Sequence, residues 1–159
     1  MSKQKIFIET TLFNRYYDTD RDGHRETVML FEAIGKGVHE GYTSTDVINE
    51  LEDAEEDKRI KMLTLIEKYG IYVLKANYEV DNLANVYIEH KVIPLKYFLD
   101  AAHIANATVN NLDSIMSFNF KHINKKKTKI MTKEINLSMG YKEIKICTPK
   151  DVFYEEDKR

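Results

Sequence analysis

Short apolar runs alternate with longer amphipathic stretches along this chain. The run from Ile6 to Ile8 is too short for a helix and ends at Glu9, which predicts a buried strand with an acid at its carboxyl end. Similar runs predict further strands at residues 39–43, 71–74, 114–118 and 144–147. Apolar residues at helical spacing predict helices at residues 25–34, 45–51, 57–68, 78–88, 95–109 and 129–139.

The order of these elements indicates the fold class. Strands that alternate with helices favour a parallel sheet, because each return to the same edge needs a crossover connection. We therefore expect an α/β fold: a three-layer α/β/α arrangement with a mostly parallel sheet of about five strands. In such folds ligands bind outside the carboxyl ends of the strands, where Glu9 is expected to lie.

The most apolar of the predicted helices carries one polar stripe. Asp100, His103, Asn106 and Asn110 fall within about a third of its circumference. An ionised acid on a mostly buried helix is unfavourable unless it is paired or bound to a metal. Asp100 is therefore a candidate site residue, although it can also cap its helix or pair with Lys96 one turn earlier.

Two other acids are ambiguous when each is taken alone. Glu9 can be an exposed carboxylate at the end of a strand. Glu50 belongs to a run of acids between Asp46 and Asp57, a pattern that is typical of a solvated helix face. The candidate chemistry therefore depends on whether these two acids meet Asp100 in space.

Four segments of the chain resemble the motifs of PIN-domain proteins, in the order and spacing of that family. In these motifs an acid followed by hydroxyl residues ends the first strand, a helix carries a second acid, an aspartate opens an alanine-rich helix, and a polar residue follows a later strand. The segments are Ile6-Phe7-Ile8-Glu9-Thr10-Thr11-Leu12-Phe13, Val47-Ile48-Asn49-Glu50-Leu51, Leu99-Asp100-Ala101-Ala102-His103-Ile104-Ala105 and Ser114-Ile115-Met116-Ser117-Phe118-Asn119-Phe120. The resemblance extends from about Lys5 to Pro149 and implies a PIN-like fold.

The resemblance also implies a metal-dependent ribonuclease. Glu9, Asp100 and Asn119 would hold Mg²⁺ or Mn²⁺ directly or through water, and Glu50 would position a second metal ion or the attacking water. A divalent cation suits this chemistry because it offsets the repulsion between the acids and an RNA phosphodiester, and because it lowers the pKa of a bound water. The products that the resemblance implies carry 5′-phosphates.

Two positions depart from the family pattern. Glu9 stands where most members have aspartate, which moves the ligand oxygen by about 1 Å but keeps the charge. Asn119 stands where many members have aspartate; its amide oxygen can still bind a hard cation, but the site loses one negative charge. We therefore expect one well-held metal ion and a second that arrives with RNA. Asp113 precedes its strand and is not expected to replace Asn119.

Several residues near these motifs are candidates for contacts with the substrate. Thr10 and Ser117 can bond the scissile phosphate, orient the acids or bond the backbone. A block of lysines that begins with Lys121 and Lys125 can contact RNA phosphates or form a solvated loop. His103 either faces the site or serves a hydrogen bond in the core.

Composition indicates a single folded domain. Hydrophobic residues make up 43% of the chain and charged residues 31%, with two prolines and six glycines, so no internal stretch has the composition of a linker. We expect one domain over residues 1–150 and a short charged tail at residues 151–159. Cys147 is the only cysteine and cannot form an intramolecular disulfide; no apolar run precedes the first charged residues, so we expect a cytoplasmic protein without membrane contact.

The resemblance also implies partners. Small PIN nucleases often act as VapC-type toxins, which are silenced by an antitoxin and usually dimerise, so RNA, an antitoxin protein and a second copy of the chain are the expected partners. One alternative is a PIN-fold RNA- or protein-binding module with little or no turnover, which the reduced charge at Asn119 favours. The other is an unrelated α/β phosphatase or nucleotide-binding module. No glycine-rich phosphate loop follows a predicted strand, which speaks against this second alternative.

Overall fold

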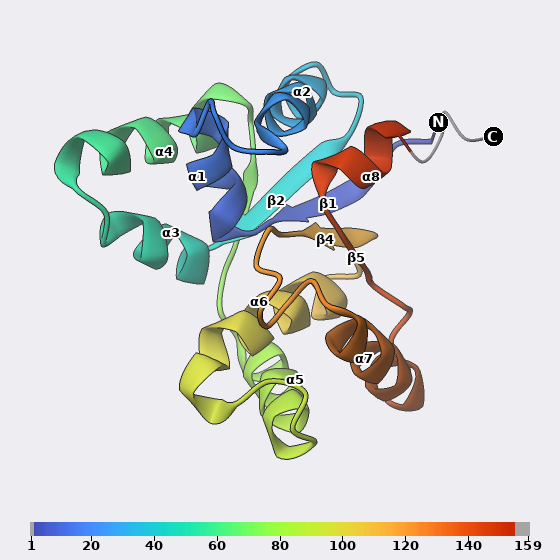
Figure 1. The fold of residues 1–159 in the computed structure, drawn as a ribbon. Helices are drawn as coiled ribbons and strands as arrows, with labels where there is room; N and C mark the ends of the chain where they lie inside the picture. The colour runs from blue at the N-terminus through green and yellow to red at the C-terminus, as the bar shows by residue number, and fades with distance from the viewer. Residues whose placement is uncertain (1, 155–159) are drawn as a thin grey trace.

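The computed structural model describes residues 2–154, which form a five-stranded sheet with helices on both faces (Figure 1). The strands lie in the order β3-β2-β1-β4-β5, and every pairing among them is parallel. Their bounds are β1 Lys5–Ile8, β2 Glu40–Ser44, β3 Tyr72–Leu74, β4 Ser114–Met116 and β5 Lys145–Cys147. The predicted three-layer α/β/α fold with a parallel sheet is confirmed.

The helices form two layers around this sheet. Figure 1 shows α1, α2, α4 and α8 on one face and α5, α6 and α7 on the other. Helix α3 contacts α1, α4 and α6, and so bridges the two layers at one end of the sheet. The bounds are α1 Thr10–Tyr17, α2 His24–Gly35, α3 Thr45–Glu52, α4 Glu56–Lys68, α5 Tyr78–Glu89, the 3-10 turn η1 Leu95–Tyr97, α6 Phe98–Val109, α7 Lys126–Ser138 and α8 Pro149–Tyr154. The six helices predicted from the apolar pattern are all present, with small shifts at their ends.

The sequence pattern does not predict helix α1, which follows β1 almost directly. The helix has only 8 residues and begins with Thr10 and Thr11, and β-branched residues have a modest helix propensity. A helix this short is stabilised mainly by packing, and here Leu12 and Phe13 are fully buried in the core. Tertiary contacts therefore override a weak local signal.

Helix α8 is also missing from the sequence-based expectation. It contacts α2, where the Tyr154 hydroxyl donates a hydrogen bond to Glu26 Oε2 at 2.6 Å. The domain boundary predicted after residue 150 falls inside α8, and residues 155–159 of the predicted tail lie outside the described residues. Residues 151–154 are thus packed against the domain.

Strand β1 lies at the centre of the sheet, between β2 and β4. Residues 6–8 are fully buried, as expected for a central parallel strand that is covered on both faces. Ile8 pairs with Met116, and the Glu9 N–H donates to the carbonyl oxygen of Met116 at 3.2 Å. The chain therefore leaves β1 and β4 side by side at the carboxyl edge of the sheet.

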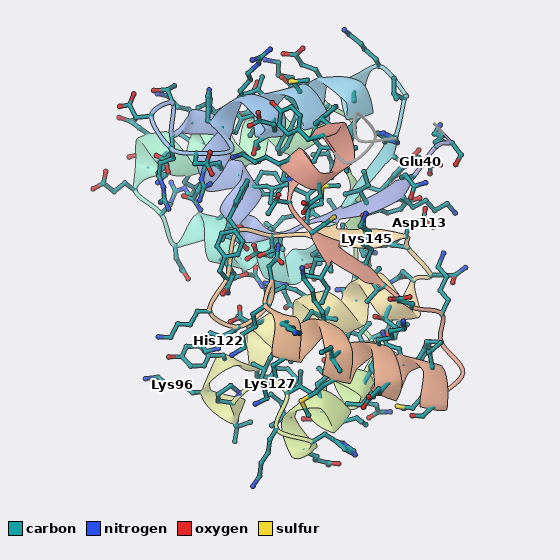
Figure 2. All side chains as sticks on the ribbon, turned by 45° about the vertical axis from the view of Figure 1, so that its right-hand side comes forward. Glu40, Lys96, Asp113, His122, Lys127 and Lys145 are labelled. Carbon is teal, nitrogen blue, oxygen red and sulfur yellow. The ribbon has the colours of Figure 1, made fainter. Side chains whose placement is uncertain are left out.

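Asp113 lies at the opposite, amino-terminal edge of the sheet. Its Oδ2 accepts a hydrogen bond from the Lys5 N–H at 2.7 Å, and its Oδ1 pairs with Lys142 at 3.0 Å. Figure 2 shows Asp113 far from His122, which belongs to the loop that follows β4. As expected from the sequence, Asp113 does not take the place of Asn119.

Candidate functional site

Three acids from different elements gather around one histidine at the carboxyl edge of the sheet. Glu9 directly follows β1, Glu50 lies on α3, and Asp100 lies in the first turn of α6. Each of them interacts with the charge of His103, whose side chain is fully buried. We call Glu9, Glu50, Asp100 and His103 the acid cluster. The structure thus brings together the three carboxylates that the sequence analysis singled out.

The parallel topology explains why these elements meet. Helix α3 starts immediately after β2, and Ser44 caps it by accepting a hydrogen bond from the Val47 N–H at 3.2 Å. Helix α6 leads into the amino end of β4, so its first turn, with Asp100, lies at the carboxyl edge. The acid cluster therefore occupies the position where open parallel sheets bind ligands.

Glu9 is nearly buried and is held by hydrogen bonds to one oxygen. Its Oε1 accepts from the Thr11 N–H at 3.1 Å, the Thr11 hydroxyl at 2.5 Å and the Ser117 hydroxyl at 2.7 Å. The carboxylate also caps α1, where the positive end of the helix dipole favours negative charge. Burial nevertheless raises the pKa of Glu9, since the charge of His103 and these hydrogen bonds offset the desolvation only in part.

Glu50 and His103 form the closest charged contact in the acid cluster. His103 Nε2 lies 2.6 Å from Glu50 Oε1, which also accepts a hydrogen bond from the Thr10 hydroxyl at 2.8 Å. Burial acts against charge on both partners, but their mutual hydrogen bond and attraction outweigh it. The pKa of Glu50 is therefore lowered and the pKa of His103 is raised, so each partner favours the charged form of the other.

Asp100 is half-buried and contacts Asn119. Burial raises the pKa of Asp100, and the charge of Glu50 adds to the effect, while His103, His122 and the Asn119 hydrogen bond oppose it. Asn119 Oδ1 accepts a hydrogen bond from the His122 N–H at 3.0 Å. Because Oδ1 of Asn119 accepts this N–H, its amide nitrogen is the group that remains to interact with Asp100.

The acid cluster has the chemistry of a divalent-cation site without a complete set of converging ligands. Carboxylate and amide oxygens suit Mg²⁺ and Mn²⁺. The hydrogen bonds that Glu9 and Glu50 accept from the described residues fall on Oε1, which leaves Oε2 of each side chain for a cation. Within residues 2–154, however, no three His, Cys, Asp or Glu side chains are grouped closely enough to hold a metal ion. The donor types fit, and full coordination requires side-chain movement or further ligands.

The two hydroxyl residues predicted to contact the substrate, Thr10 and Ser117, donate hydrogen bonds to carboxylates of the acid cluster. Thr10 donates to Glu50, and Ser117, which is fully buried, donates to Glu9 and accepts from the Asn119 N–H at 2.9 Å. Both hydroxyls therefore orient acids, one of the roles that the sequence left open for them.

The two lysines proposed as substrate contacts lie in the loop between β4 and α7. Lys121 is exposed, and its Nζ lies 5.9 Å from the centre of the Tyr97 ring. Lys125 precedes the first residue of α7 and lines a surface groove together with His122. Their ammonium groups are thus on the surface next to Asn119, rather than within the acid cluster.

Two residues with clear structural roles were not assigned any by sequence analysis. Thr11 bonds Glu9 through both its N–H and its hydroxyl, and the signal for this was a hydroxyl residue two positions after an acid at a helix start. His122 packs its ring on Tyr97, with 3.9 Å between ring centres. The sequence does not predict the contact between His122 and Tyr97, because these residues lie on separate elements.

The sequence matches no protein-family model, and no curated protein is detectably similar to it. Comparison of the fold is informative, because the domain shares its fold with solved structures of VapC-type PIN-domain proteins. A Sarcin-Ricin loop cleaving toxin, VapC20 of Mycobacterium tuberculosis, is similar with a TM-score of 0.57 and 13% identity, over 87% of this chain and 97% of that chain. VapBC2 of Rickettsia felis, in a structure bound to a DNA fragment from their promoter, is similar with a TM-score of 0.56 and 10% identity, over 89% and 96% of the two chains.

The helices of residues 2–154 are short or polar relative to a bilayer span. None of them is both long enough and apolar enough to cross a membrane.

Proposed function

We propose that this protein is an endoribonuclease that hydrolyses RNA phosphodiester bonds with the help of Mg²⁺ or Mn²⁺. The observation that carries the proposal is the convergence of Glu9, Glu50 and Asp100 on His103 at the carboxyl edge of a PIN-type sheet. The acid cluster contains three acids and a single basic side chain, His103, and burial disfavours the ionised forms of Glu9 and Asp100. A bound cation would relieve this excess of negative charge.

The residues of the cluster have distinct parts in the proposed site. Glu9 and Asp100 would ligate the cation, whose chemistry is to lower the pKa of a bound water and to offset charge on the phosphate. Glu50 is held by Thr10 and His103 and is oriented to position the attacking water or a second cation. Asn119 was expected to ligate metal through Oδ1; that oxygen already accepts the His122 N–H, so we propose that Asn119 acts chiefly by orienting Asp100.

A second candidate function is a PIN-fold module that binds RNA or protein with little or no turnover. It is favoured by the same contact of Asn119, and by the lack of a ready three-ligand group within residues 2–154. Both functions are compatible with the observed fold, and they differ in whether the acid cluster supports cleavage.

Cleavage of a single-stranded RNA by the purified protein separates the two functions. We expect activity that requires Mg²⁺ or Mn²⁺, that EDTA abolishes, and that Asp100→Asn reduces at least about 100-fold, the effect of removing one preorganised electrostatic group. Asp81→Asn is the matched control, since Asp81 is an exposed acid in the first turn of α5. Activity that survives EDTA, or that both variants retain equally, contradicts the assignment of the acid cluster. Tight RNA binding without any cleavage supports the binding module.

We further propose that the protein acts in the cytoplasm as the toxin of a toxin-antitoxin pair and as a homodimer. The support is the fold shared with VapC20, described as a toxin, and with VapBC2. Expression in bacterial cells should arrest growth, and Asp100→Asn should relieve the arrest. Light scattering on the purified chain measures the dimer directly. Growth that is equal with the wild type and with Asp100→Asn excludes the toxin role, and a monomeric mass excludes the dimer.

A further inference from the structure

A groove of about 490 Å³ lies beside the acid cluster, between the chain that joins α5 to η1 and the start of α7. We call it the lysine groove, and its main lining residues are Lys91, Val92, Leu95, His122, Lys125 and Lys127. Figure 2 shows His122, Lys96 and Lys127 on this part of the molecule. The groove therefore combines an apolar wall with three cationic side chains.

His122 connects the lysine groove to the acid cluster. Its N–H is bonded to Asn119, and its side chain interacts with the charge of Asp100. The side chain is 8% exposed, and its Nε2 atom is buried without a hydrogen-bond partner among the described residues. A buried imidazole nitrogen without a partner destabilises the fold, because it has lost water and gained no hydrogen bond. His122 lines the groove, so a ligand there could satisfy this nitrogen once the ring shifts to expose it.

The start of α7 carries an unusual concentration of positive charge. Lys125 is the cap residue and makes no side-chain capping hydrogen bond, Lys126 and Lys127 follow it, and the first turn contains no acid. Lysines at the amino end of a helix are repelled by the positive end of the helix dipole. The same arrangement becomes favourable when an anion binds there, because free backbone N–H groups and ammonium groups then face negative charge.

We propose that the lysine groove binds a segment of single-stranded RNA that flanks the bond to be cut. Lys125, Lys127 and Lys91 contact its phosphates, and the apolar wall around Leu95 accepts a base. A shift of the His122 ring on binding lets Nε2 bond a phosphate or sugar oxygen. This inference rests on the proposed function for the substrate class. It adds the surface along which the RNA strand continues beyond the acid cluster.

An RNA strand suits the groove better than an acidic protein segment does. Phe120 is outside the groove lining, but it lies two residues before His122 in the sequence and is 57% exposed, so it offers a further ring on which a base can stack. Leu95 is 70% exposed and extends the apolar surface. An RNA strand combines the apolar faces of its bases with phosphate charges at regular spacing. A run of acidic side chains has the charge but no group that would pack on these apolar residues.

The test measures RNA binding separately from cleavage. Fluorescence anisotropy of a labelled single strand of about 12 nucleotides is recorded in EDTA, with every variant made in the Asp100→Asn background. The pair Lys125→Gln and Lys127→Gln is expected to weaken binding about tenfold and to reduce the slope of log K against log salt by about 1.4, or about 0.7 per phosphate contact. The matched control is Lys58→Gln with Lys61→Gln, exposed lysines of α4 on the other face of the sheet. The control pair is expected to change binding less than twofold.

A second variant tests the histidine. His122→Phe keeps a ring against Tyr97 but removes Nε2, and it is expected to weaken RNA binding about fivefold, the value of one net hydrogen bond. The variant pair in α7 should not melt below its parent, because it removes charge that the helix dipole repels. A lower affinity together with an undiminished melting temperature therefore supports a binding role.

Three results overturn the inference. One is equal loss of affinity in the groove pair and the control pair, which indicates only general attraction by charge. Another is unchanged affinity in both the groove pair and His122→Phe. The third is that a glutamate peptide of equal charge binds more tightly than RNA and depends on the same lysines. Because no step requires cleavage, a protein that binds RNA in this groove but never cuts it contradicts the proposed function and leaves this inference standing.

Discussion

The acid cluster and the lysine groove are neighbours on one surface, but they hold their charges in opposite ways. Glu9 and His103 are buried, and hydrogen bonds from other elements fix both of them. In the groove, Lys91 and Lys127 are exposed side chains on flexible stems. Burial fixes a charge at a defined point, which chemistry requires, whereas exposure lets a charge follow a ligand of variable shape. This difference is what we expect if the acid cluster carries out the proposed chemistry and the groove captures the proposed substrate.

The two regions also differ in how their like charges are balanced. Within the acid cluster, His103 serves as an internal counterion for Glu50, while burial raises the pKa of the other two acids, Glu9 and Asp100. Around the start of α7 the first turn supplies no acid to balance its lysines. Each region therefore has an excess of charge of one sign, and a ligand of the opposite sign would offset it.

Removal of the internal counterion is expected to give the largest change in stability. His103→Phe leaves Glu50 without its imidazole partner, and loss of one partner of a buried pair costs about 3–5 kcal/mol. The Glu50 side chain is 29% exposed and can regain water, so we expect a loss nearer about 2 kcal/mol, or roughly 5 °C in Tm. Urea unfolding monitored by circular dichroism measures this difference.

His103→Gln provides the control for that experiment. Its amide can still donate a hydrogen bond to Glu50 but carries no charge, so its stability should lie between those of the wild type and His103→Phe. If all three proteins unfold at the same urea concentration, His103 does not hold the acid cluster together, and the contrast drawn between the two regions fails.

Some features of the acid cluster can be predicted from the sequence, and others cannot. The short apolar run before Glu9 and the polar stripe with Asp100 were enough to place both residues at the carboxyl edge, because strand ends and helix faces follow from local periodicity. The bond from Glu50 to His103 spans 53 positions and depends on how α3 and α6 pack, which no local pattern encodes. Asn119 had a local signal that was not used: asparagine often accepts an N–H a few residues ahead, as it does here from His122.

The lysine groove was harder to predict than the lysines themselves. The block with Lys121 and Lys125 is evident in the sequence, and its interpretation as an RNA contact was one of two that remained open. Its opposite wall comes from the connection between α5 and η1, including Lys91 and Leu95, which lies about 30 positions earlier. Proximity between these segments results from the fold alone.

The pH dependence of stability is expected to show a smaller, graded effect of the acid cluster. The pKa values of Glu9 and Asp100 are raised above 4.5 and 3.8, so the folded protein retains protons that the unfolded chain has released, and stability falls as pH rises through that range. The pKa of His103 is raised above 6.5, so its contribution is complete below that pH and is lost at higher pH. Glu50, with a lowered pKa, acts in the opposite sense and weakens the fold only as pH falls below 4.5.

Without divalent ions, the protein should therefore be less stable at about pH 8 than at about pH 5.5. Thermal melts in EDTA across this range measure the trend. The double variant Glu9→Gln and Asp100→Asn is the control, since it removes two of the three responsible groups and should flatten the dependence. A wild-type protein that gains stability toward pH 8, or a double variant with the same slope, shows that other groups dominate the titration.

The smallest expected effect is a change in Tm that tests the helix dipole of α7 independently of RNA binding in the lysine groove. Lys126 lies in the first turn of α7 but does not line the groove. Lys126→Glu replaces a repelled charge with an attracted one, so Tm should rise by about 2 °C, while RNA binding falls only by the general effect of charge. Lys133→Glu is the matched control, because it makes the same change of charge further along the helix and removes the contact of Lys133 with Glu143 at 3.7 Å. Its Tm should not rise. If both variants melt at the same temperature, the helix dipole does not measurably repel the lysines at the start of α7. One of the reasons for an anion to bind in the groove is then absent.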